Sequence, residues 1–169
     1  MAAIGSRTFK AFAYVPSPAQ AEAIANEAVQ EAGIDPGPWL KEVRRLQKAG
    51  VTKQYTDIEI QYCFLGKGCL CGVANEAMCK IALEIEETAG TPLLFFGGYT
   101  GGCNSYLPTA EEFDKGGYEV LWSNLVYFPY HGRVMPLRRE TAGALVEEVV
   151  RGWRELKGKL TCPAYGAQK

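Results

Sequence analysis

The chain has 169 residues, with 18 lysines and arginines against 19 acidic residues, and 47% of it is hydrophobic. This length and apolar content are typical of one globular domain, so we expect residues 1–169 to form a single domain. The net charge of −1 gives no electrostatic footprint for nucleic acid. No apolar stretch approaches the roughly 20 residues of a transmembrane segment, and the first residues have no apolar signal core, which favours a cytoplasmic location.

Six cysteines are present without any Cys-x-x-Cys pair, so we expect reduced thiols. Cys69 and Cys71 would share one face of a strand, with Cys63 nearby in the sequence. A metal site built from these thiols therefore remains an alternative.

The first third of the chain predicts one short extended segment and two helices. Residues 9–15 are extended, and a helix then begins with Ser17 as its N-cap and Pro18 in its first turn. Gly33 ends this helix, and a second helix covers residues 39–49. Both have an apolar stripe on one side only, so we expect them to lie on the surface of a sheet.

The central segment predicts strands around one more helix. Residues 57–64 alternate strictly between polar and apolar, and a Gly-Lys-Gly turn leads to a second strand at 69–73, which together indicate a hairpin. Asn75 is the predicted N-cap of a helix over 76–88. Residues 92–96 are continuously apolar, as in a strand that is buried on both faces.

The last third begins with a glycine-rich loop at 97–108. A capping box from Thr109 to Glu112 opens a short helix, residues 118–128 indicate a strand, 129–136 a loop, and 140–157 the final helix. The whole pattern predicts an α/β fold with a mixed, largely buried sheet flanked by helices.

Two junctions contain the candidate functional residues. Glu76 directly follows a predicted strand, although the helix dipole alone favours an acid in the first turn of a helix. The loop at 97–108 holds Tyr99, Asn104 and Tyr106 and matches no phosphate-binding motif; its length and its glycines favour a binding role over a mere connection. His131 is the only histidine, and we expect it to be solvated or bonded to backbone.

The sequence LFFGGYTGGCNSYLPTAEEFDKGGYE at 94–119 resembles the neutral/alkaline ceramidase family, as does GVANE at 72–76. The stretch SRTFKAFAYVPSPAQAEA near the N-terminus is also similar to the family. The resemblance spans most of the chain, from Phe9 to about Leu156, and corresponds to the C-terminal half of the family's catalytic domain.

This resemblance implies a zinc-dependent amide hydrolase, whose zinc is held by two histidines from the first half of the domain and by a glutamate and a tyrosine from the second half. By motif position, Glu76 and Tyr106 correspond to the two metal ligands of the second half. Tyr106 and Tyr118 would be catalytic, and Tyr99 and Asn104 would contact substrate.

The histidine-bearing half has no counterpart in this chain, and His131 lies outside the matched positions. Two oxygen ligands alone should not hold zinc tightly. We therefore expect a subunit or remnant of a hydrolase whose partner chain supplies the histidines. The alternative is a non-catalytic binding or assembly module that forms a homo-oligomer, with Glu76 and Tyr106 serving as helix cap and core.

Overall fold

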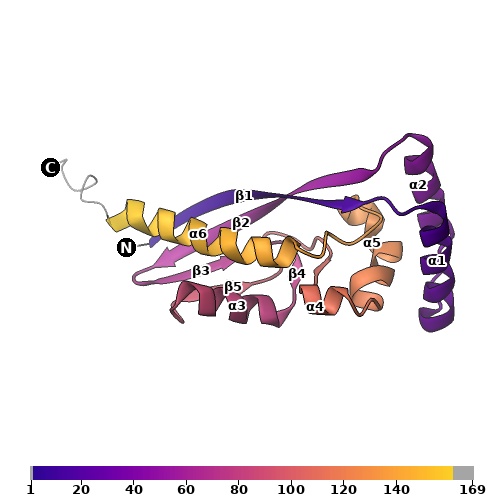
Figure 1. Ribbon diagram of the computed structural model, residues 1–169. Coiled ribbons are helices and arrows are strands. Elements are labelled where there is room, and N and C mark those ends of the chain that lie inside the picture. The colour runs from indigo at the N-terminus through magenta and orange to yellow at the C-terminus, as the bar shows by residue number, and fades with distance from the viewer. Residues whose placement is uncertain (1, 162–169) are drawn as a thin grey trace.

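A four-stranded sheet forms the centre of the computed structural model, which describes residues 2–161, Thr161 by its backbone only (Figure 1). The strands are β1 (Ala2–Tyr14), β2 (Lys53–Leu65), β3 (Gly68–Gly72) and β5 (Leu94–Gly97), in the order β1-β2-β3-β5. β2 is antiparallel to both β1 and β3, and β5 is parallel to β3. The sheet is therefore mixed, which confirms the predicted α/β class.

Two helices cover one face of this sheet, α3 (Cys79–Ala89) and α6 (Thr141–Thr161). The predicted alternation in β2 is confirmed, because its inward side chains are buried among residues of both helices. The buried Tyr62 hydroxyl donates to the Val149 carbonyl at 3.0 Å and so ties β2 to α6. The inward face of α6 consists of Leu145, Val146, Val149 and Trp153, which are buried, and Leu156, which is partly buried.

The opposite face of the sheet carries exposed apolar side chains. Register places Ile4, Cys63, Leu70 and Phe95 in one row across the four strands, and Phe95 is 66% exposed. The prediction that residues 92–96 are buried on both faces is therefore wrong. β5 is an edge strand that buries only Leu94 and Phe96, and an apolar run cannot distinguish this case from a central strand.

Helices α1 (Pro18–Ala32) and α2 (Gly37–Lys48) stand at one end of the molecule (Figure 1). The prediction that they lie on the sheet is wrong, because they build a second core with residues of the 122–135 segment. The Trp39 indole, fully buried there, donates to the Val134 carbonyl at 2.7 Å. The predicted caps are confirmed: Ser17 accepts from the backbone of Gln20, and Gly33 is left-handed.

Residues 118–131 are helical, so the predicted strand at 118–128 is wrong. A π-helix, η1 (Tyr118–Trp122), continues into α5 (Ser123–His131). The aromatic and β-branched residues here favour a strand locally, but the segment packs against α1 and α2 as a helix. The buried Asn124 amide donates to the Val120 carbonyl at 2.8 Å, a bond between successive helical turns. The short α4 (Ala110–Phe113) has the predicted Thr109 as its N-cap, whose side chain accepts from the Glu112 backbone N–H.

The described helices include none that is long and apolar enough to cross a bilayer. Cys69 and Cys71 are buried under the helices, whereas register places Cys63 on the opposite, open face. The three thiols therefore do not form one cluster, and Cys162 lies outside the described residues.

Candidate functional site

A short pairing of two strands positions the predicted site. β4 (Glu76–Ala77) and β6 (Tyr106–Leu107) form a parallel ladder that places Glu76 directly beside Tyr106. The Glu76 backbone N–H donates to the Ser105 carbonyl at 3.0 Å. The predicted helix start at Asn75 is wrong, because α3 begins at Cys79 with Met78 as N-cap. The helix dipole therefore does not account for an acid at position 76.

The glycine-rich loop is fixed to the chain segment that precedes Glu76. The backbone N–H groups of Tyr99 and Asn104 donate to the carbonyls of Asn75 and Ala74 at 3.2 and 2.9 Å. At Gly98 the two backbones come so close that a Cβ atom would lie 2.6 Å from the Asn75 carbonyl oxygen. Only glycine permits this approach, which brings the loop over Glu76.

The Glu76 carboxylate lies within hydrogen-bonding reach of two phenols, those of Tyr99 and Tyr106. The bond to Glu76 raises the pKa of Tyr99 to about 12, and burial followed by the Glu76 charge raises the pKa of Tyr106. Both phenols are therefore protonated donors at neutral pH. Tyr99 holds its place with a φ of 57°, a left-handed conformation that is uncommon outside glycine and typical of functional segments.

This cluster opens into a cavity of about 330 Å³, which we call the Glu76 cavity. Its walls come from β4, the glycine-rich loop and α5, three elements that lie far apart in the sequence. The lining residues are Glu76, Cys103, Ser105, Tyr106, Tyr127, Tyr130 and His131. The cavity thus combines a carboxylate, phenols and an imidazole within one concave site.

Tyr118 lies outside the cavity lining and packs against Tyr106. Its ring lies edge-on to that of Tyr106, with the centroids 6.3 Å apart. Its hydroxyl is hydrogen-bonded to Tyr127, which raises the pKa of Tyr118 to about 12. Because Tyr127 lines the cavity, the pair links η1 to the wall. π-Helical turns such as η1 are frequent at functional sites.

The structure brings four of the predicted site residues together: Glu76, Tyr99, Tyr106 and Tyr118. The fifth, Asn104, contributes its backbone N–H to the loop and does not line the cavity. Its predicted role in substrate binding is untested, and the geometry gives it a structural role.

Sequence reasoning missed the far wall of the cavity. Tyr127 and Tyr130 reach it only because residues 118–131 are helical, and the segment was predicted as strand and loop. His131 is bonded to backbone as predicted, since its Nδ1 accepts from the Arg133 N–H at 3.3 Å, yet it also lines the cavity. The spacing of Tyr127, Tyr130 and His131 fits one helical face and could have marked this wall.

The donor set of the cavity does not fit a zinc ion by itself. Glu76 and Tyr106 offer two oxygens, whereas catalytic zinc sites take at least three protein ligands that include nitrogen or sulfur. Among residues 2–160, no group of three or more histidine, cysteine or acidic side chains could hold a metal. This chain alone therefore does not provide the predicted zinc site.

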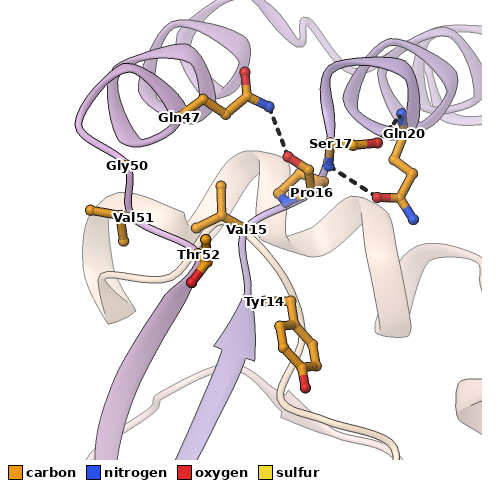
Figure 2. Close-up of a pocket in the computed structure, with 9 residues that line it drawn as sticks. All are labelled: Tyr14, Val15, Pro16, Ser17, Gln20, Gln47, Gly50, Val51 and Thr52. Carbon is orange, nitrogen blue, oxygen red and sulfur yellow. Dashed lines mark hydrogen bonds between the residues drawn. The ribbon is translucent and has the colours of Figure 1, made fainter.

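A second cavity of about 530 Å³ lies where the chain enters α1 and leaves α2 (Figure 2). We call it the Gln47 cavity; its lining comes from residues 14–20 and 47–52. The Gln47 amide donates to the Pro16 carbonyl at 2.7 Å, and the Ser17 N–H donates to the Gln20 side chain at 3.0 Å (Figure 2). Its lining includes the Tyr14 phenol with hydroxyl and amide side chains, and it includes no carboxylate, imidazole, amine or thiol.

Comparison with known proteins yields a partial likeness. No family model matches the chain, and no curated protein matches it. Among solved structures, the chain is similar to neutral ceramidase from Pseudomonas aeruginosa, with a TM-score of 0.40 and 24% identity. The match covers 56% of this chain and 14% of that enzyme. The likeness is one of fold, over a small part of the enzyme's length.

Proposed function

We propose that this chain contributes the carboxylate and tyrosine half of a metal-dependent amide hydrolase site, and that a second chain contributes the rest. The observation that carries the proposal is the convergence of Tyr99 and Tyr106 on the Glu76 carboxylate at a cavity. A similarity in sequence motif and a partial likeness in fold to a ceramidase are in accord with it.

The chemistry of the cavity suits an acyl substrate. Protonated phenols are donors that can bind the oxygen of an amide carbonyl as negative charge develops on it. Tyr106 lines the cavity, and burial together with the Glu76 charge raises its pKa further above the neutral range. The Tyr118 and Tyr127 pair fixes the orientation of the neighbouring ring.

The zinc ligands that this chain does not supply indicate what the partner chain must contribute. Zinc would require nitrogen ligands beside Glu76 and Tyr106, and histidines on a second chain are the simplest source. The open face of the sheet, with Ile4, Leu70 and Phe95 exposed, provides apolar surface for such an association. Function therefore depends on an assembly in which both chains contribute to one site.

The test is to isolate the assembly from the native source with a tagged full-length chain and to measure its zinc content and its hydrolysis of a fluorogenic N-acyl amide. We expect about one zinc per chain and metal-dependent hydrolysis.

Tyr106→Phe removes a single hydroxyl and should lower the rate of hydrolysis about 100-fold. Glu76→Gln should abolish stoichiometric zinc. Glu87→Gln and Tyr55→Phe, both exposed and distant from the cavity, are the matched controls.

Two results would count against the proposal. One is a chain that purifies as a monomer without a histidine-bearing partner. The other is an assembly whose zinc content and hydrolysis are unchanged in Glu76→Gln. Stoichiometric zinc that Glu76→Gln removes would in turn exclude a purely structural module.

A further inference from the structure

Arg133 is a buried charge without an acidic partner. The residue is 2% exposed, and no acid among residues 2–160 forms an ion pair with it. Its Nη2 donates to the Ser105 Oγ at 2.6 Å, and its Nε has no hydrogen-bond partner. A buried guanidinium normally pairs with an anion, because its desolvation costs several kcal/mol. Arg133 is therefore a buried cation that no acid of residues 2–160 neutralises by direct contact.

Ser105 connects this charge to the Glu76 cavity. Its side chain lines the cavity and accepts the short hydrogen bond from Arg133. The Ser105 hydroxyl itself donates only to its neighbouring carbonyl, that of Tyr106, at 3.4 Å. Because its oxygen is polarised by a guanidinium, the hydroxyl is a strong donor that can turn toward a ligand. The backbone of Ser105 has a φ of 87°, so this position is held in a strained conformation.

His131 supplies a second unused donor in the wall of the Glu76 cavity. Its Nδ1 accepts the Arg133 backbone N–H, so the proton of a neutral ring lies on Nε2. Burial, with the nearby Arg133 charge, lowers the pKa of His131 to about 4, which keeps the ring neutral at neutral pH. Its Nε2 is buried without a partner, and the ring lines the cavity.

We propose that the Glu76 cavity binds a ligand carboxylate through the Ser105 hydroxyl and the His131 Nε2–H, with the Arg133 guanidinium as the compensating charge behind them. Arg133 supplies one positive charge, and Glu76 carries one negative charge in the lining of the same cavity, so the site favours a monoanion over a more highly charged ligand. If the proposed amide hydrolysis is correct, the substrate class is that of N-acyl amino acids, in which a carboxylate lies close to the amide. This extension rests on the proposed function, whereas binding of the carboxylate does not.

The test is isothermal titration of the full-length chain, free of metal, with N-acetylglycine and with its neutral counterpart N-acetylglycinamide. We expect N-acetylglycine to bind at least about tenfold more tightly, which is the scale of one hydrogen bond to a charged group. Inorganic phosphate serves as a third probe and should bind more weakly than N-acetylglycine, since it carries more charge than one guanidinium compensates.

The variants are chosen so that the fold is retained. Ser105→Gly removes the hydroxyl and relieves a backbone conformation that glycine adopts freely, and it should abolish the preference for N-acetylglycine. His131→Gln keeps an acceptor for the Arg133 N–H and should reduce the preference. Arg44→Met, a substitution of an exposed arginine on α2, is the control and should leave it intact.

Equal affinity for the two N-acetyl probes, or no measurable binding of either, would overturn the proposal. So would a preference that persists in Ser105→Gly, or tighter binding of phosphate than of N-acetylglycine. Since the titration uses neither metal nor partner, a preference without any amide hydrolysis in the assembly would contradict the proposed function and leave the carboxylate subsite standing.

Discussion

The Glu76 cavity and the Gln47 cavity differ in how their polar groups are satisfied. The Gln47 cavity is the larger, about 530 against 330 Å³, but its polar side chains bond to neighbouring backbone. Around the Glu76 cavity, by contrast, buried atoms of Asn75, His131 and Arg133 lack partners. Two further unpaired atoms, of Trp122 and Asn124, lie in the helical segment at 118–131, and none belongs to the lining of the Gln47 cavity. Unpaired groups, rather than volume, therefore distinguish the Glu76 cavity from the Gln47 cavity.

The largest expected difference between the two regions is in the free energy of unfolding, when one glycine in each region is replaced by alanine. Gly98→Ala would place a methyl group 2.6 Å from the Asn75 carbonyl oxygen, and we expect a loss of about 3 kcal/mol in the free energy of unfolding. Gly50→Ala meets nothing within 4 Å and has only its φ of 70° to oppose it, so about 1 kcal/mol is expected. Urea denaturation of both variants tests the pair. Equal losses would show that the two backbones do not meet at Gly98.

The next effect concerns His131 and depends on pH. Burial holds its pKa at about 4, below the ordinary value of 6.5, so the unfolded chain binds more protons between these values. The resulting stability is present above pH 6.5 and lost as the pH falls through 4, on the order of 2 kcal/mol. Carboxylates also titrate in this range, so the measurement is the difference between the wild type and His131→Gln. Parallel stability curves would contradict a buried, neutral His131.

A smaller effect is expected at the edge of the Gln47 cavity. Ser17→Ala removes the N-cap of α1 and should lower the free energy of unfolding by about 1 kcal/mol. It should leave the tyrosine titrations of the Glu76 cavity unchanged, because the two regions are independent. Thermal denaturation and tyrosine NMR of the same variant check both statements. A changed titration would show that the cavities are coupled.

The sequence predicts best where local signals determine the structure. The alternation in β2, the glycine that ends α1 and the Thr109 cap of α4 are confirmed because each depends on neighbouring residues. The motifs that contain Glu76 and Tyr106 could also be identified from residues adjacent in the sequence. The β4 and β6 ladder brings these two residues side by side, although the predicted helix start at Asn75 was wrong.

The rest depends on long-range packing that no local pattern contains. The strand predicted at 118–128 has β-favouring aromatics, yet packing against α1 and α2 makes it helical. Arg133 follows His131 in a segment without any motif, and only the fold shows that its charge is buried behind Ser105. Burial without a partner is a tertiary property, so the carboxylate subsite could not be predicted from the sequence.

The most direct test of the account is a tyrosine titration in Glu76→Gln. The hydrogen bond to Glu76 raises the pKa of Tyr99 to about 12 from the ordinary 10.0, and the substitution removes that charge. In spectra of ¹³C-labelled tyrosine, assigned with Tyr99→Phe, wild-type Tyr99 should remain protonated up to about pH 11. In Glu76→Gln its pKa should fall clearly from about 12 toward 10.0, with burial and the neighbouring Cys103 and Tyr106 keeping it somewhat raised. If Tyr99 titrates identically in both proteins, its phenol does not bond to Glu76, and the central site of this structure is wrong.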